Sequence, residues 1–263
     1  MTLTPTHPGE RRTQNRLTPS SRLNGYAVRL AAILLAALTL SGCQSISMNS
    51  AQLRVIDASP DSGVIDSYQN TSALAYNLGF GTMTSYVPMS PGAYNFAADK
   101  AGTRQALAVS TDTLVAGKQY TEIIGSSLVN LQQTVLLDQS TSAPTGQIAV
   151  RLVNEATRSG AVDVYLVPMS GRLVNTAPIA INLSFGGNSG YISMPNGTYA
   201  IDVVPTGTTL AASTVTLLSG AQVEYASGAV RTVVLIDQET LVAQHAALSQ
   251  GVQAIVAADA DAQ

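Results

Sequence analysis

The sequence predicts an all-β protein made of two tandem antiparallel β-sandwich domains of the immunoglobulin-like type. Three observations predict this class. Apolar residues alternate with polar ones at a period of two, for example at 162–166 and 199–203, which is the pattern of half-buried strands. Turn-forming residues interrupt these runs at short intervals, as at 90–92 and 195–197. The pattern then repeats after about a hundred residues, the length of a whole domain.

The first 42 residues have the composition of an export signal. Five arginines and a single acid precede an apolar run at residues 30–40, an order typical of a secretory signal peptide. This run is much shorter than the 20 or so residues of a membrane-spanning helix. It ends in Leu40-Ser41-Gly42-Cys43, which resembles a bacterial lipobox, and Cys43 is the only cysteine. We therefore predict a lipoprotein signal peptide over residues 1–42, with an ordinary signal peptide as the alternative.

The resemblance to bacterial lipoproteins implies that the mature chain begins at Cys43 and carries a diacylglycerol on its sulfur. It also implies a further acyl chain on the new amino group. Several chains anchor a protein durably, because each buried methylene contributes about 0.8 kcal/mol. Gln44 replaces the aspartate that retains lipoproteins at the inner membrane, so we expect a lipid-anchored protein of the cell envelope at the outer membrane. Residues 43–51 are small and polar and form the predicted tether.

The charge of the mature part limits its partners. Five of the 13 basic residues but only one of the 16 acidic residues precede Cys43, so the mature net charge is near −7. Nucleic acid is excluded as a partner, because binding it requires clustered basic residues. An anionic membrane surface is equally unfavourable. We therefore expect membrane contact through the lipid on Cys43, and an envelope protein or a glycan as the further partner.

Internal repetition defines the two domains. At an offset of 97, residues 53–57 match 150–154, and Asp66 and Tyr68 match Asp163 and Tyr165. Larger offsets of 105, 103 and 99 extend the match through the pairs Tyr94 and Tyr199, Gly117 and Gly220, and Asp138 and Asp237. Loops of variable length explain the changing offset. The predicted domains are residues 52–140 and 147–238.

The C-terminal segment has a different period. Leu241, Leu248, Val252 and Ile255 recur at helical spacing. We therefore predict that residues 239–263 are a tail containing a short amphipathic helix.

Several runs of the first copy resemble the bacterial family called domain of unknown function 4397. They are the run LRVIDASPDSGVIDSY at 53–68, PGAY at 91–94 and GKQYT at 117–121. The second copy is looser, with Val223 taken as the counterpart of the tyrosine in GKQYT. Asp57 and Asn154 stand where the family often has a histidine. The resemblance implies a β-sandwich outside the cytoplasm and implies no activity.

The Pro-Gly-x-Tyr turns resemble tyrosine corners, in which a phenol bonds back to the backbone a few residues upstream. Tyr94 and Tyr199 are accordingly interpreted as structural. Gly92 and Gly197 are expected at positions that require a positive φ.

Metal and phosphate chemistry is not indicated. Asp57, Asp61 and Asp66 are close in sequence and carry the oxygen ligands that calcium prefers, but their spacing is not that of a calcium loop. The second copy also has Asn154 and Arg158 in the first two positions. The glycines at 79–81 and 186–187 lie in strand connections and not before a helix. No metal and no cofactor are predicted.

Enzymatic activity is not predicted either. Nucleophilic catalysis requires a base beside the nucleophile, most often histidine, and the mature part has only His245. Carboxylates that recur in both copies, namely Asp66, Asp163, Asp138 and Asp237, are interpreted as parts of the scaffold. An envelope hydrolase remains an alternative.

Glycan binding is the other alternative. The sequence has no tryptophan, the best aromatic platform, but Tyr68 and Tyr165 alternate away from the apolar face of their strands and form a small platform. We therefore predict a non-catalytic binding or structural protein of the cell envelope, with a polysaccharide- or peptidoglycan-binding accessory protein as an alternative.

Overall fold

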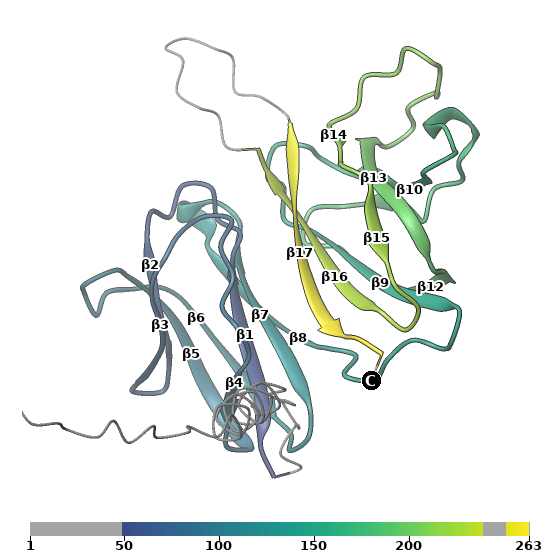
Figure 1. Cartoon of the computed structure of the whole chain (residues 1–263). Coiled ribbons are helices and arrows are strands. Elements are labelled where there is room, and N and C mark those ends of the chain that lie inside the picture. The colour runs from purple at the N-terminus through teal and green to yellow at the C-terminus, as the bar shows by residue number, and fades with distance from the viewer. Residues whose placement is uncertain (1–48, 239–250, 263) are drawn as a thin grey trace, which may run out of the picture. The chain divides into compact units, whose positions relative to one another are not determined.

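The computed structural model describes residues 49–238 and 251–262. Their regular structure consists of strands and two 3-10 turns, Leu128–Asn130 and Leu173–Asn175. The strands form four sheets in two sandwich-like halves (Figure 1), which confirms the predicted all-β class. No helix in the described part of the chain has the length and hydropathy to cross a membrane. The predicted signal peptide, Cys43 and His245 lie outside the described residues.

The first sandwich consists of two four-stranded sheets, with strand orders β4-β1-β7-β8 and β3-β2-β5-β6. Phe96, Leu53 and Leu114 are among the fully buried side chains between them. The strands are β1 (Ala51–Asp57), β2 (Ile65–Gln69), β3 (Ser72–Leu78), β4 (Val87–Met89), β5 (Gly92–Lys100), β6 (Ala106–Leu114), β7 (Gln119–Gly125) and β8 (Gln132–Leu137).

The second sandwich repeats this arrangement, with orders β12-β9-β16-β17 and β11-β10-β13-β14, and with β15 also pairing with β13. Val150, Leu152 and Leu235 belong to its core. The strands are β9 (Gln147–Asn154), β10 (Val162–Pro168), β11 (Ala180–Leu183), β12 (Asn188–Pro195), β13 (Gly197–Pro205), β14 (Leu218–Ser219), β15 (Val223–Tyr225), β16 (Val230–Asp237) and β17 (Val252–Ala260).

One pairing in each sandwich departs from the predicted antiparallel arrangement. β1 pairs with β7 in parallel, and β9 pairs with β16 in the same way. Parallel neighbours need a long crossover between them. Here the crossover is the whole opposite sheet of the sandwich, because β2, β3, β5 and β6 lie between β1 and β7 in the chain.

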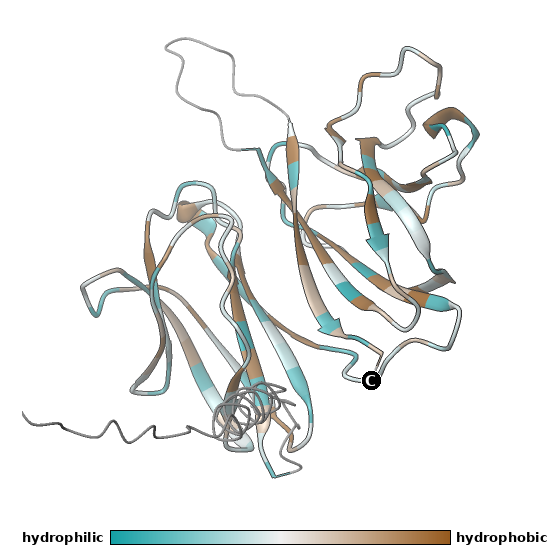
Figure 2. Ribbon diagram, viewed as in Figure 1, coloured by the Kyte–Doolittle hydropathy of each residue, from teal (hydrophilic) through white to brown (hydrophobic). Residues whose placement is uncertain are grey.

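We call the sheets β4-β1-β7-β8 and β12-β9-β16-β17 the inner sheets. Their central strands, β1, β7, β9 and β16, are buried on both faces. In β1, Leu53 and Val55 point into the first core, whereas Ile56 joins a separate apolar cluster with Val234 and Ile236 of the second sandwich. This cluster lies between the two sandwiches. A strand buried on both faces is expected to be largely apolar. Figure 2 shows hydrophilic stretches within the hydrophobic inner strands, and buried polar residues such as Arg54 and Arg151 belong to these strands. The other two sheets are the outer sheets.

The described part of the predicted tail forms a strand and not a helix. β17 pairs antiparallel with β16 along its whole length, from Asp237 opposite Val252 to Val230 opposite Ala260. Val252 and Ala257 are buried because they complete the second sandwich. Apolar residues at helical spacing also fit a strand here, since β17 is partly covered on both faces. The second sandwich therefore continues beyond residue 238.

This strand also corrects the internal alignment after residue 114. Gly117 donates its N–H to Ser50 O, and Gly228 makes the same bond to Gln147 O, each at 2.8 Å. β7 is therefore repeated by β16, and β8 is repeated by β17. Consequently Asp138 corresponds to Asp259 and not to Asp237, and the counterpart of Gly117 is not Gly220.

Candidate functional site

A buried aspartate on a central strand joins the neighbouring edge strand to a loop at one end of each outer sheet. In the first sandwich Asp66 accepts backbone hydrogen bonds from Asn77 and Gly102, each at 2.9 Å. In the second sandwich Asp163 accepts the equivalent bonds from Asn182 at 2.8 Å and from Gly207 at 3.4 Å. The bonds match pair by pair, so these aspartates belong to the shared scaffold, as the sequence predicted.

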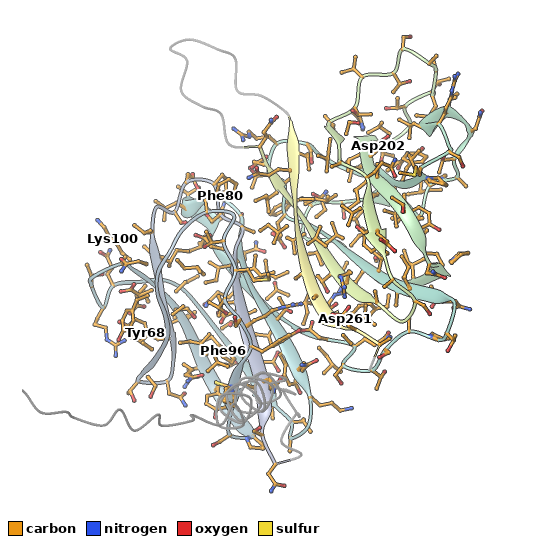
Figure 3. The ribbon with its side chains drawn as sticks, in the orientation of Figure 1. Tyr68, Phe80, Phe96, Lys100, Asp202 and Asp261 are labelled. Carbon is orange, nitrogen blue, oxygen red and sulfur yellow. The ribbon has the colours of Figure 1, made fainter. Side chains whose placement is uncertain are left out.

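At this end of the first outer sheet, β2 and β3 and the loop between β5 and β6 bring an aromatic pair and an arginine together. The guanidinium carbon of Arg104 lies 3.8 Å above the centre of the Tyr68 ring, and the Tyr76 ring meets the Tyr68 ring edge to face at 6.0 Å. Tyr68 lies on the outer sheet of the first sandwich (Figure 3) and is only 8% exposed, whereas Tyr76 is 65% exposed. Cation–π stacking on Tyr68 thus fixes Arg104 beside an accessible ring.

This arrangement lines an open pocket of about 510 Å³. Asn77, Gly102 and Thr103 complete its wall. Among the described residues, the Arg104 guanidinium has polar contacts only with Asp99, at 3.9 Å, and with Thr71 O, at 3.4 Å, and its side chain is 57% exposed. The guanidinium therefore has donors left for a ligand. We call this pocket the Tyr76–Arg104 pocket.

The equivalent place in the second sandwich is covered by the chain itself. Tyr165 is 5% exposed and packs in a cluster with Leu173 and Leu210, which belong to the longer loops of that half. Matching Asn77 with Asn182 and Gly102 with Gly207 makes Ile181 the counterpart of Tyr76, and Thr209 the counterpart of Arg104. The predicted platform of Tyr68 and Tyr165 therefore does not form across the two halves, and only Tyr68 takes part in an open pocket.

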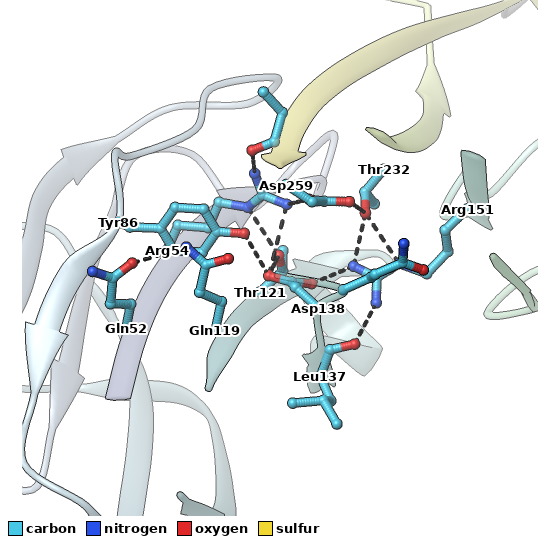
Figure 4. A network of polar contacts seen from close by, with 12 residues as sticks. Gln52, Arg54, Tyr86, Gln119, Thr121, Leu137, Asp138, Arg151, Thr232 and Asp259 are labelled. Atoms are coloured by element: carbon cyan, nitrogen blue, oxygen red, sulfur yellow. Dashed lines mark hydrogen bonds and ion pairs between the residues drawn. The ribbon is translucent and has the colours of Figure 1, made fainter. Parts of the chain in front are cut away.

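A second polar cluster lies between the inner sheets (Figure 4). Arg54 of the first sandwich pairs with Asp259 of the second, and Arg151 of the second pairs with Asp138 of the first. Each arginine also donates to a backbone oxygen across the interface, Arg54 to Ala258 O at 2.8 Å and Arg151 to Leu137 O at 2.9 Å. The two halves therefore exchange identical contacts, as the two subunits of an isologous dimer do.

Each carboxylate in this exchange is held within its own half by a threonine and a tyrosine. Thr121 and Tyr86 each donate to Asp138 at 2.7 Å. Thr232 and Tyr191 donate to Asp259 at 2.7 and 2.8 Å. Burial raises the pKa of Tyr86 and of Tyr191 above the ordinary value, so both phenols stay protonated as donors. The cluster is saturated with protein contacts, which makes it a structural interface and not a ligand site.

In the described part of the chain, three further carboxyl groups are buried and have no basic partner there. Burial raises the pKa of Asp57, Glu122 and Glu155 to about 7 in each case. Glu122 lies in the first core, where it accepts a hydrogen bond from Gln133 at 2.6 Å and one from Ser67 at 3.4 Å. In the second sandwich the counterparts of Glu122, Ser67 and Gln133 are the apolar residues Val233, Val164 and Ala254. This group of three polar side chains is therefore specific to the first sandwich.

The aspartates considered as a calcium site serve separate turns. Asp57 accepts a bond from Ser59 N at 3.0 Å, and Asp61 accepts one from Leu128 N at 2.7 Å, while Asp66 joins the strand and the loop described above. Within residues 49–238 and 251–262, no group of three or more His, Cys, Asp or Glu side chains is arranged to hold a metal ion. Asp237 caps the turn at Thr157, whose hydroxyl donates a hydrogen bond to the Asp237 carboxylate at 2.5 Å.

The Gly-x-Tyr turns at 92–94 and 197–199 have the geometry of tyrosine corners. Tyr94 donates to Ser90 O at 2.7 Å, and Tyr199 donates to Pro195 O at 2.9 Å. Gly92 has a φ of +150°, where glycine is favoured. Gly197 differs from the expectation, since its φ is not positive. A Cβ at this position would lie 3.4 Å from Tyr199 Cε2, an ordinary van der Waals contact, so the structure gives no steric reason for glycine there.

Sequence reasoning missed the residues that matter most in both clusters. Arg54 and Arg151 were aligned at the offset of 97, and their recurrence in otherwise apolar strands was a usable signal of a buried charge. Asp259 was hidden by the helical interpretation of the tail. Tyr76 and Arg104 do not recur in the second copy, so no repeat pattern marked them.

The comparisons with known proteins concern the first sandwich and the fold. Residues 51–165 match the family model described as "Domain of unknown function (DUF4397)", so the match covers the first sandwich and the first strands of the second. A search of curated proteins found no significant match. A solved structure described as "Alpha-glucan binding by a streptococcal virulence factor" matches with 8% identity over 59% of this chain and 80% of that chain, with a TM-score of 0.24. We draw nothing about ligands from a likeness at that level.

Proposed function

We propose that this chain is a lipid-anchored, non-catalytic protein of the cell envelope, which presents the outer sheet of its first sandwich to a ligand. The observation that carries the proposal is the difference between the two copies. They share their loop-holding aspartates and their interface residues, yet among the described residues the first has at this place an open pocket with an exposed ring and an exposed guanidinium. Two open pockets of the second are lined by Arg172 and contain no aromatic residue. Residues that recur in both copies serve the scaffold, whereas residues that differ are free to serve binding.

A non-catalytic role is supported by the engagement of the recurring ionisable groups. Asp66 and Asp163 are bonded to backbone N–H groups, and Asp138 and Asp259 are paired with arginines. A catalytic acid or base must reach the proton that it transfers, and these carboxylates are buried between protein groups.

The lipid anchor is tested by changing its attachment site. Cys43→Ala should release the protein from the membrane fraction into the soluble fraction, because a single small residue replaces the acylated sulfur. Fractionation of cells followed by mass spectrometry of the mature N-terminal peptide measures both location and acylation. Cys43→Ala protein that stays with the membrane, or a wild-type N-terminal peptide without acyl chains, would contradict lipid anchoring.

A further inference from the structure

We infer that the Tyr76–Arg104 pocket binds a neutral sugar unit of a glycan. The inference rests on the proposed function, since it names the class of ligand for the face described there. Four properties of the pocket carry it: the accessible ring, the free donors around it, the local charge balance, and the position of the pocket on the sheet.

The ring supplies the apolar part of the site. Tyr76 is exposed over 65% of its surface, and its edge-to-face contact with Tyr68 holds it in place at little further cost in conformational entropy. A sugar ring offers a face of C–H groups and a rim of hydroxyls, which suits an aromatic side chain with an apolar body and a polar tip. The counterpart Ile181 has no such plane, although it is 68% exposed.

The donors suit pairs of neighbouring hydroxyls. Arg104 presents a planar fork of N–H groups, and its stacking on Tyr68 at 3.8 Å fixes the plane of that fork. Asn77 adds an amide beside it, at a residue whose φ of +53° is held by the bond from its backbone N–H to Asp66. A few convergent polar groups around an apolar surface are typical of small-molecule sites, and a volume of about 510 Å³ is in their usual range.

The charges around the pocket favour a neutral ligand over an acidic one. Asp99 lies 3.9 Å from Arg104, and Asp66 is a wall residue. These two carboxylates offset the guanidinium, so the pocket has no surplus of positive charge for a phosphate or a uronic acid. The mature chain is also acidic as a whole, which disfavours the approach of anions.

The position of the pocket argues against a peptide ligand. A peptide that adds a strand to a sheet pairs with the backbone of an edge strand. The pocket is lined by side chains over the end of the outer sheet, from Tyr68 of β2, Tyr76 and Asn77 of the edge strand β3, and the loop residues Gly102 and Thr103. A compact ring with hydroxyls around it fits this place better than a chain that needs backbone partners.

The test is isothermal titration of the lipidated full chain, in detergent micelles, with defined oligosaccharides. The neutral probes are the hexaoses of β-1,4-glucose, α-1,4-glucose and N-acetylglucosamine, and the acidic probe is a galacturonic acid hexamer. We expect at least one neutral probe to bind, and the acidic probe to bind no more tightly. Tyr76→Ala and Arg104→Ala should each weaken binding of that neutral probe at least tenfold, whereas Tyr76→Phe should retain most of it.

The second sandwich supplies a matched control. Ile181→Ala removes an equally exposed side chain from the equivalent place and should leave binding unchanged. Melting curves of all variants check the fold, and Tyr76→Ala should melt as the wild type does because its side chain is mostly exposed. The inference is overturned if no neutral probe binds, if the acidic probe binds more tightly, or if Tyr76→Ala binds as the wild type does.

Failure of this inference can be distinguished from failure of the proposed function. Co-sedimentation with purified cell-envelope fractions is measured with the same variants. If the wild type binds the envelope fraction, Tyr76→Ala does not, and no sugar probe binds, the proposal that this face binds a ligand stands. The inference that the ligand is a neutral sugar is then refuted. Absence of both kinds of binding would refute the ligand-presenting face as well.

Discussion

At the scale of single residues, a comparison of equivalent positions in the two sandwiches shows which buried polar groups have hydrogen-bond partners. Asn154 accepts a bond from Ala156 N at 3.1 Å and donates to Gly160 O and Leu183 O at 3.1 and 3.0 Å. Its counterpart Asp57 repeats only the accepting bond. The second carboxyl oxygen of Asp57 is buried without a partner, because a carboxylate has no N–H to donate. The first sandwich therefore has a carboxyl group, Asp57, at a position where the amide of Asn154 forms all of these hydrogen bonds in the second sandwich.

This difference predicts the pH dependence of stability. Burial raises the pKa of Asp57 from 3.8 to about 7, so between these values the folded chain keeps a proton that the unfolded chain has lost. The free energy of unfolding should therefore fall as the pH rises from about 4 to 7, and stay low above that. Asp57→Asn should remove this loss and stabilise the protein at pH 8 by on the order of 2 kcal/mol. Urea denaturation at pH 5 and pH 8 measures both effects.

The converse substitution is the control. Asn154→Asp should destabilise the protein at pH 8 and add a pH dependence of the same sign. If Asp57→Asn lowers stability at pH 8, or Asn154→Asp leaves it unchanged, the interpretation of this pair is wrong.

At the scale of elements, the sequence predicted the strands in which apolar and polar residues alternate. It missed β17, in which they do not. Residues 162–166 and 199–203 have a clear period of two and form β10 and β13. β17 has alanines at many positions, and small apolar residues fit a helix and a covered strand equally well. What decides its structure is the pairing with β16, which periodicity alone does not contain.

The role of β17 predicts the effect of truncation. A chain ending at Gln238 loses β17, one of the two strands that pair with β16. It also loses Asp259, so buried Arg54 would keep only the more distant Asp138 at 3.8 Å. Removing one partner of a buried pair alone costs about 3–5 kcal/mol. We expect this chain to lose its cooperative thermal transition or to aggregate. A chain ending at Asp261 is the control and should melt as the full chain does. A chain ending at Gln238 that unfolds with unchanged stability would contradict the place of β17 in the second sandwich.

At the scale of the whole described unit, the two sandwiches are joined by an interface with the symmetry of a dimer. Each half contributes an arginine, a threonine, a tyrosine and an aspartate to it. Each arginine makes its closest ion pair with the aspartate of the other half, Arg54 with Asp259 and Arg151 with Asp138, while Arg54 lies 3.8 Å from Asp138 of its own half. The exchange thus makes each buried charge dependent on the other half.

This dependence predicts a large effect of breaking one pair. Arg54→Met should lower the free energy of unfolding by about 3–5 kcal/mol, because Asp259 stays buried without its guanidinium. Combining it with Asp259→Asn should recover part of the loss, since the uncompensated charge is removed. Urea denaturation of the single and double variants measures the coupling.

Arg231→Met is the matched control. Arg231 pairs at 2.5 Å with Asp261, whose side chain is 63% exposed, and exposed pairs contribute less than about 1 kcal/mol. A loss for Arg54→Met that is no greater than the loss for Arg231→Met would refute the role of the buried exchange.

The sequence by itself determined the all-β class, the duplication and most strand positions, because alternation and turn residues are local properties of the chain. It did not determine which sheets are inner and which are outer, because period two shows that a strand has two faces but not what covers each. Only the tertiary structure brought Arg54 to Asp259, 205 residues away in the chain, and Arg104 onto Tyr68. Such contacts depend on loop lengths and on the partner of each face, and these are settled only when all the strands pack together.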